Sequence, residues 1–147
     1  MFVVADEYRW NLMVITLTVM YYVLLGLVPW RARRQYLTPV YLKKEFGAEH
    51  LKATLKEIVG EGCMERKYFI VGHPDNGSGR YTMKAGYKAW LEFNKSLRIY
   101  QNFQENIMQV LISELIAGLY FPIFTASIAG IYLVARIIYH WDYLRSP

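Results

Sequence analysis

The sequence has a single cysteine, Cys63, which excludes an intramolecular disulfide and any metal site built from several cysteine ligands. We interpret Cys63 as an ordinary thiol rather than a nucleophile. The glycines of residues 73–80, HPDNGSGR, are not followed by Gly-Lys-Ser/Thr, so no phosphate-binding loop is predicted. The first thirty residues show neither a small-residue cleavage site nor an arginine-rich, acid-poor leader. We therefore expect neither a metal site nor a cleaved leader.

The composition of the sequence is dominated by apolar residues. They make up 54% of the 147 residues, aromatic residues make up 16%, and there are 13 tyrosines. Two long apolar regions, at about 11–30 and 107–138, are long enough to cross a bilayer at about 1.5 Å per residue. The sequence therefore predicts an all-α integral membrane protein with a single membrane domain, residues 1–147.

The positive charge is concentrated between the two apolar regions. The net charge is +5, and 14 of the 17 lysines and arginines lie between Arg31 and Arg98, among only seven acidic residues. This distribution is typical of a basic loop on the inner side of a membrane. A soluble nucleic-acid binder is excluded by the two apolar regions. We expect membrane lipids as partners, no nucleic acid, and the N-terminus outside.

Three transmembrane helices are expected. The first spans about 10–30 and ends at Pro29, Trp30 and a basic cluster; the second spans about 96–120 and the third about 123–143. Pro122 suits a tight turn better than the middle of a helix. The alternative is one kinked helix of roughly thirty residues across this region. The hairpin would return the C-terminus to the side of the basic loop.

The stretch at about 35–92 is expected to be an extended, partly structured first loop. Its apolar residues recur at intervals that predict an amphipathic helix ending at Gly60 and Gly62, on the membrane surface or against a partner. Two short strands are predicted at Lys67–Val71 and Tyr81–Met83, on either side of the turn at residues 73–80. The apolar residues of the helix are Leu42, Phe46, Leu51, Leu55 and Ile58.

Arg98, Asn102 and Glu105 enter the second apolar region on one face of a helix, because their spacings are four and three residues. Polar groups at such a place usually face protein or a wet cavity and mark function. Two other interpretations stay open. In the first, Arg98 and Glu105 only neutralise each other's charge inside a helical bundle. In the second, the nearby tyrosines form an aromatic belt at the membrane interface and the basic residues anchor the helix at the lipid headgroups.

These residues resemble the MAPEG superfamily, the membrane-associated proteins of eicosanoid and glutathione metabolism, such as leukotriene C synthase and microsomal glutathione transferases. The family's second helix carries Arg-x-x-x-Asn-x-x-Glu, which Arg98-Ile-Tyr-Gln-Asn102-Phe-Gln-Glu105 matches. Its third helix carries Ala-Arg and two tyrosines four apart, like Ala135-Arg136, Tyr139 and Tyr143. A basic pair ends its first helix, like Arg33-Arg34. The resemblance covers roughly half of the chain.

The resemblance implies a helical bundle, usually a homotrimer, that binds glutathione as a co-substrate between subunits near the cytosolic face. It implies a transferase or peroxidase acting on lipophilic electrophiles or lipid hydroperoxides, in the endoplasmic reticulum or a mitochondrial membrane. Tyr139 and Arg34 would be catalytic, by stabilising the thiolate of glutathione. The implied glutathione-binding residues are Arg33, Arg34, Arg98, Asn102, Glu105, Tyr139 and Tyr143.

The sequence also departs from the family pattern. Members normally have four transmembrane helices, whereas three are expected here, and the arginine at the start of the fourth helix has no counterpart. Asn106 stands where a tyrosine often follows the motif glutamate, and the first loop is longer. These departures support an alternative: a non-catalytic accessory subunit of a large membrane complex, such as a mitochondrial respiratory assembly, built on a recruited MAPEG fold.

Overall fold

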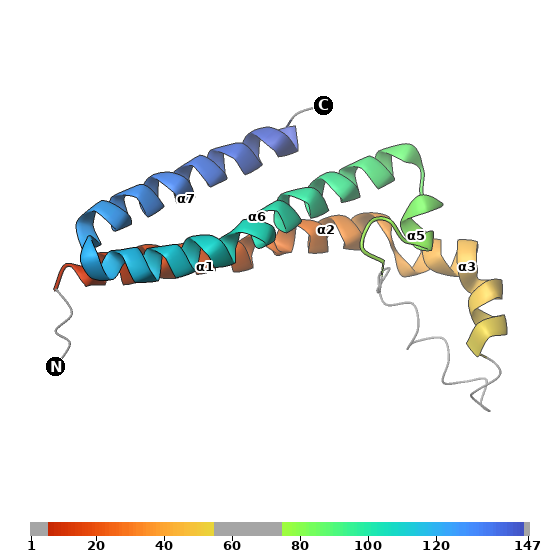
Figure 1. Ribbon diagram of the computed structural model, residues 1–147. Coiled ribbons are helices and arrows are strands. Elements are labelled where there is room, and N and C mark those ends of the chain that lie inside the picture. The colour runs from red at the N-terminus through yellow and green to blue at the C-terminus, as the bar shows by residue number, and fades with distance from the viewer. Residues whose placement is uncertain (1–5, 55–74, 146–147) are drawn as a thin grey trace. The chain divides into compact units, whose positions relative to one another are not determined.

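The computed structural model of the protein describes residues 6–54 and 75–145. No strand occurs in these residues, which agrees with the predicted all-helical fold. The expected strand at Lys67–Val71, the helix end at Gly60 and Gly62, and Cys63 lie outside the described residues. The helices, shown in Figure 1, are α1 (Tyr8–Leu25), α2 (Leu27–Tyr36), α3 (Pro39–Thr54), α5 (Arg80–Met83), α6 (Tyr87–Tyr120) and α7 (Pro122–Arg145).

The chain forms two compact units. Unit 1 comprises Met1–Leu27 and Arg98–Pro147, and unit 2 comprises Val28–Leu97. Unit 1 therefore contains α1, most of α6 and all of α7, whereas unit 2 contains most of α2, then α3, α5 and the start of α6. The stretch expected as the first loop falls almost entirely within unit 2, and much of its described part is helical.

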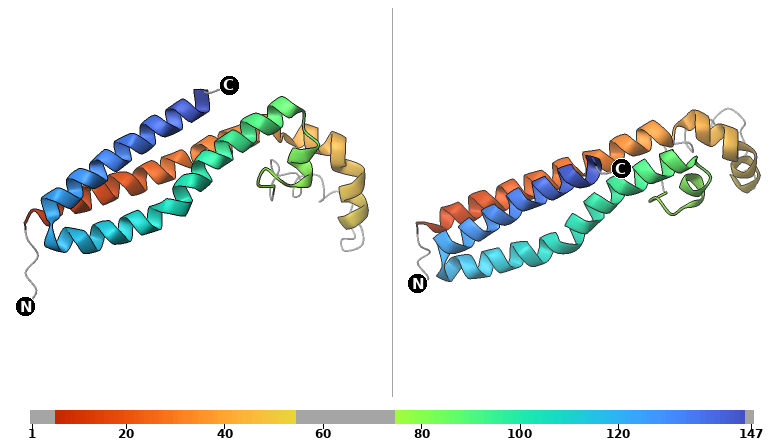
Figure 2. Two further views of the ribbon diagram at one scale, coloured as in Figure 1. Left: turned by 45° about the horizontal axis from the view of Figure 1, so that its top comes forward. Right: turned by 90° about the horizontal axis from the view of Figure 1, so that it is seen from above.

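In unit 1, α7 lies along α1, as both views of Figure 2 show. Their shared core contains Val14 of α1 with Ala126 and Ala129 of α7. Small residues such as these alanines allow helices in a membrane to approach closely. At one end of the interface, the Asn11 side-chain amide donates to the Pro122 carbonyl at 2.9 Å. This bond ties the first helix to the beginning of the last.

The chain reverses direction at Phe121. α6 ends at Tyr120, and α7 begins at Pro122 and runs back in the opposite direction (Figure 2). Pro122 occupies the first position of α7, where a backbone N–H has no partner within the helix in any case. The boundaries therefore agree with the predicted hairpin and not with a single kinked helix.

Two helical segments are long and apolar enough to cross a membrane: the 29 residues Tyr8–Tyr36 and the 24 residues Pro122–Arg145. Their large apolar side chains are mostly exposed, for example Val23 at 65% and Ile131 at 70%, as expected of surfaces that face lipid. α6 is longer, at 34 residues, but it is more polar. Among the described helices, it is therefore not one of the two segments that are apolar enough to cross a membrane. The third span and the orientation stay predictions.

The helical segment extends beyond residue 30, where the first membrane span is expected to end. After Gly26 the chain continues as α2 through Tyr36. Pro29 is the third residue of α2, within its first turn, where a proline is tolerated because no internal hydrogen bond is lost. Proline and the basic cluster therefore do not end the helix at this point.

Unit 2 has a core of its own. Leu37, Phe93 and Leu97 are buried together at the contact between the end of α2 and the beginning of α6. Leu42 and Phe46 of α3 are also buried. The apolar face of the predicted amphipathic helix thus begins as expected, but its first residues pack inside unit 2.

Asp75 organises the turn that precedes α5. Its carboxylate accepts backbone N–H groups from Gly77 at 2.9 Å, Gly79 at 3.1 Å and Thr82 at 2.8 Å. Gly77 has φ +95°, a conformation that favours glycine. The predicted strand Tyr81–Met83 is therefore wrong: these residues form a helical turn, because Asp75 satisfies N–H groups that a helix start leaves unpaired.

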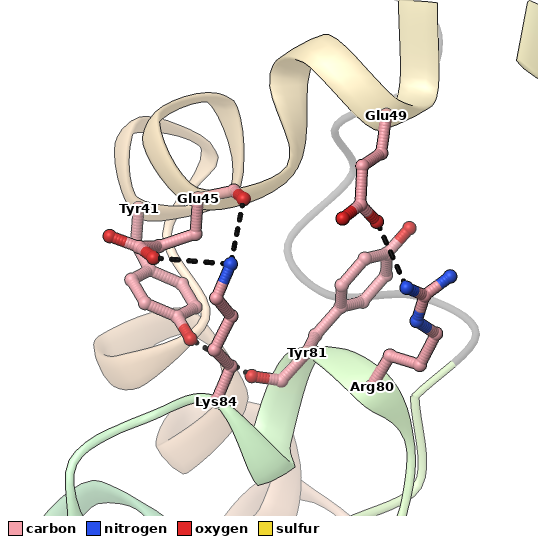
Figure 3. Close-up of polar contacts among 6 residues, drawn as sticks. All are labelled: Tyr41, Glu45, Glu49, Arg80, Tyr81 and Lys84. Atoms are coloured by element: carbon pink, nitrogen blue, oxygen red, sulfur yellow. Dashed lines mark hydrogen bonds and ion pairs between the residues drawn. The ribbon is translucent and has the colours of Figure 1, made fainter. Parts of the chain in front are cut away.

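Four polar contacts join α3 to the α5 segment (Figure 3). The Tyr41 hydroxyl donates to the Tyr81 carbonyl at 3.0 Å. Burial, together with the carboxylates of Glu45 and Asp75, raises the pKa of Tyr41, so it remains a donor at neutral pH. The other three contacts are the ion pairs Arg80–Glu49 at 3.0 Å and Lys84–Glu45 at 3.6 Å, and a hydrogen bond from the Lys84 ammonium to the Glu45 carbonyl at 3.2 Å.

Asp75 makes the stability of unit 2 depend on pH. Burial raises the pKa of Asp75, but hydrogen bonds from Thr82, Gly77 and Gly79 together outweigh burial, and the net effect lowers it. Because the folded pKa lies below the unfolded one, the carboxylate stabilises the fold at pH values above the unfolded pKa. That stabilisation is lost as the pH falls through the folded pKa.

We expect Asp75→Asn to destabilise this turn by about 1–3 kcal/mol at pH 7, because three N–H groups lose an ionised acceptor. Hydrogen exchange of the Gly77, Gly79 and Thr82 amides, compared at one pH, measures the effect. The same substitution at the exposed Asp142 should leave the hydrogen-exchange rates of these amides unchanged. Equal protection of the three amides in wild type and Asp75→Asn at pH 7 would contradict this role.

Candidate functional site

The two sequence motifs meet through a hydrogen bond between Asn102 on α6 and Arg136 on α7. The Arg136 Nη1 donates to the Asn102 Oδ1 at 2.7 Å, and its Nε donates to the Tyr132 hydroxyl at 2.9 Å. Its guanidinium carbon lies 5.8 Å from the centre of the Phe103 ring. An arginine on an otherwise apolar helix needs such partners. Arg136 is part of the third-helix sequence motif but was not among the predicted site residues.

Arg98 and Glu105 lie on the same face of α6 as Asn102, as their spacing predicted. The Arg98 Nη1 is 3.8 Å from the Glu105 Oε1, and the two side chains are 57% and 60% exposed. An exposed pair at this distance contributes little to stability. In the single chain, this exposure leaves both groups accessible to a charged ligand.

Tyr139 and Tyr143 form the tyrosine pair of α7. Their ring centres are 5.9 Å apart, and Tyr139 is 43% exposed. They follow Arg136 by three and seven residues, and α7 runs opposite to α6. At about 1.5 Å per residue they lie roughly 4.5 and 10 Å from Arg136, toward the Arg98 end of α6. Within the described residues, neither hydroxyl forms a hydrogen bond to Arg98, Asn102 or Glu105.

An aromatic cluster fixes α1 against the two motif helices. Phe103 is fully buried at its centre. The Tyr21 hydroxyl lies 2.6 Å from the His140 Nδ1, and both rings are within 5.7 Å of each other and of Phe103. The Tyr100 hydroxyl donates to the Tyr22 hydroxyl at 2.8 Å, and these rings stack. These residues were not among the predicted site residues; the sequence signal for them is the tyrosine pair Tyr21-Tyr22 inside the apolar first helix.

The structure groups Arg33 and Arg34 with unit 2. The Arg33 guanidinium donates to the Asp75 carbonyl at 2.8 Å and to the Asn76 side-chain oxygen at 3.2 Å. Arg34 is exposed, and its guanidinium carbon lies 4.6 Å from the centre of the Trp30 ring. Arg33 is therefore held by the Asp75 turn, and the glutathione-binding roles of both arginines stay predictions.

The exposed groups on α6 and α7 suit a small molecule that carries charges of both signs. Arg98 can bind a carboxylate through two hydrogen bonds, and Glu105 can bind an ammonium. The Tyr139 hydroxyl can donate a hydrogen bond to an anion. Within residues 6–54 and 75–145, no group of three or more His, Cys, Asp or Glu side chains is placed to hold a metal ion.

Comparison with known proteins gives one family. The sequence profile of the MAPEG family matches residues 11–147. The matched range includes the motif residues of α6 and α7 together with Arg33 and Arg34. No match was found among curated proteins or among solved structures.

The bond between Arg136 and Asn102 should be visible as a non-additive loss of stability. Arg136→Met and Asn102→Ala each remove one partner, and the double variant removes both. We expect a coupling free energy of about 0.5–3 kcal/mol from thermal unfolding in neutral detergent. The control cycle pairs Asn102→Ala with Arg145→Met and should be additive. Additivity of the Arg136 cycle as well would mean that the bond does not join the helices.

Proposed function

The chain belongs to the MAPEG family, and from this premise we propose that it is a glutathione-dependent transferase or peroxidase that acts on lipophilic substrates. The family consists of membrane bundles whose members generally use glutathione and commonly form trimers. The observation that carries the proposal is the 2.7 Å bond between Arg136 and Asn102. This bond brings the motif faces of α6 and α7 together along one stretch of unit 1.

The charges on this face match those of glutathione, which has two carboxylates, one ammonium and a thiol. Arg98 binds one carboxylate, and Glu105 binds the ammonium. Asn102 accepts from Arg136 through its oxygen and keeps its amide N–H groups for a peptide carbonyl. Tyr143 extends the same face along α7. The proposed roles of Arg33 and Arg34 rest on the sequence resemblance alone.

The chemistry starts from the thiolate of glutathione. A hydrogen bond from the Tyr139 hydroxyl stabilises the sulfur anion, with positive charge from Arg34 as the second contribution. In the transferase reaction the thiolate attacks an electrophilic carbon, a carbon–sulfur bond forms, and a leaving group departs. In the peroxidase reaction the thiolate attacks a hydroperoxide oxygen, which forms the sulfenic acid of glutathione and releases an alcohol. A second glutathione then converts the sulfenic acid into glutathione disulfide and water.

The openness of the site supports a multi-copy assembly in a membrane. Arg98, Glu105 and Tyr139 are about half exposed in the single chain, whereas a tripeptide is normally held in a more enclosed site. A neighbouring copy in a homotrimer encloses the face. A lipophilic substrate reaches the site from the surrounding bilayer, in the endoplasmic reticulum or a mitochondrial membrane.

A second candidate function is that of a non-catalytic accessory subunit of a large membrane complex. The observation that favours it is unit 2, which has its own core of Leu37, Phe93 and Leu97. Such a unit offers a docking surface for other subunits. Gentle extraction with detergent separates the two functions, because a homotrimer supports the enzyme and a much larger particle supports the accessory subunit.

We expect Arg98→Ala to lower the affinity for glutathione by about tenfold or more, because a carboxylate loses its bidentate partner. Tyr139→Phe should lower the conjugation rate by about 100-fold, with a smaller effect on affinity, because its hydroxyl acts on the developing anion. Calorimetry measures affinity, and product formation with a lipophilic electrophile measures the rate. Lys88→Ala, an exposed cation on α6, is the control.

An unchanged affinity of Arg98→Ala for glutathione, together with an unchanged conjugation rate in Tyr139→Phe, would contradict the proposed site. If wild type binds glutathione without forming product, the ligand site stands and the accessory-subunit function is favoured.

A further inference from the structure

A groove of about 440 Å³ lies between α6 and α7, next to the reversal at Phe121. Its walls are mainly apolar, with Val110 and Ala117 from α6 and Phe124 and Ile128 from α7. The volume falls within the roughly 300–1,000 Å³ typical of small-molecule sites. None of the proposed glutathione-binding residues lines it.

Glu114 is the one charged residue in the wall of this groove. It is only 3% exposed, and within residues 6–54 and 75–145 neither carboxylate oxygen has a hydrogen-bond partner. Along α6 it lies twelve residues beyond Asn102, about 18 Å away, so it is separate from the glutathione face. A buried carboxylate without a partner is unfavourable, and more so within a membrane. Glu114 is therefore a buried acidic side chain in the groove wall that has no hydrogen-bond partner among the described residues.

The neighbouring residues of α1 do not supply that partner. Asn11 is fully buried against Gly118, one helical turn beyond Glu114. One N–H of the Asn11 amide donates to the Pro122 carbonyl, and among the described residues Asn11 forms no hydrogen bond to either Glu114 oxygen. What the groove lacks is a donor with positive charge.

We propose that the groove between α6 and α7 binds a single-chain lipophilic amine, with its ammonium paired to Glu114 and its alkyl chain along the apolar wall. An ammonium carries only donors, whereas an ionised carboxylate carries only acceptors, so their charges and hydrogen bonds are complementary. The oxygens of Ser113 and Thr125, which also line the groove, accept the remaining N–H groups.

Other lipid classes fit the groove less well. A fatty acid brings a second negative charge against Glu114. A fatty alcohol fills the same space but leaves the carboxylate without a cation. An alkyl amine is protonated at neutral pH, as a lysine side chain with a pKa of about 10.4 is. Glu114 therefore selects the amine over its neutral and acidic counterparts.

The test compares dodecylamine with dodecanol, which has the same chain and a neutral head group, on the full chain in neutral detergent. A ligand that binds only the folded protein raises the unfolding temperature as its concentration increases. We expect dodecylamine to raise it at lower concentrations than dodecanol. Glu114→Gln should weaken dodecylamine binding by about tenfold or more and leave dodecanol binding unchanged.

Two further variants make the test specific. Glu92→Gln removes an exposed carboxylate of α6 outside the groove, and its affinity for dodecylamine should equal that of wild type. Ala117→Leu fills the groove without removing the carboxylate and should weaken the binding of both dodecylamine and dodecanol. This variant also tests the site if Glu114→Gln does not fold. Equal affinities of wild type for amine and alcohol, or full amine binding in Glu114→Gln, would overturn the proposal.

Discussion

The hydrogen bond between Arg136 and Asn102 is the interaction on which the arrangement of unit 1 depends. A guanidinium on an apolar helix is stable only where acceptors and aromatic faces surround it, and Asn102, Tyr132 and Phe103 provide these. The bond crosses from α6 to α7, so it sets how far one helix can slide along the other. The exposed groups of α6 and the tyrosines of α7 then lie along the same stretch.

The hairpin of α6 and α7 has different chemistry at its two ends. Near Arg98 the polar groups are exposed and carry both signs of charge, which suits a soluble tripeptide. Near Phe121, Asn11 and Glu114 are buried, and Glu114 lies in the wall of an apolar groove. The aromatic cluster around Phe103 lies in the same stretch of α6 and α7 as the Arg98 end and holds α1 against both helices. The two proposed ligands therefore occupy separate sites on the same pair of helices.

The features that the sequence predicted correctly have local causes. Spacings of four and three residues place Arg98, Asn102 and Glu105 on one face of any α-helix, and Pro122 favours a helix start. The features that were missed depend on contacts between distant residues. The helical turn at Tyr81–Met83 requires the Asp75 carboxylate, and the pair of Tyr21 with His140 joins residues 119 positions apart. Neither contact leaves a periodic pattern in the sequence.

The central claim is that glutathione binds on the shared face of α6 and α7. Photo-crosslinking with a glutathione that carries a benzophenone group on its sulfur, followed by peptide mass spectrometry, tests it most directly. The account predicts adducts on peptides from Arg98–Glu105 and Arg136–Tyr143 that disappear when excess unlabelled glutathione competes. Adducts confined to other parts of the chain, or adducts that unlabelled glutathione does not suppress, would contradict it.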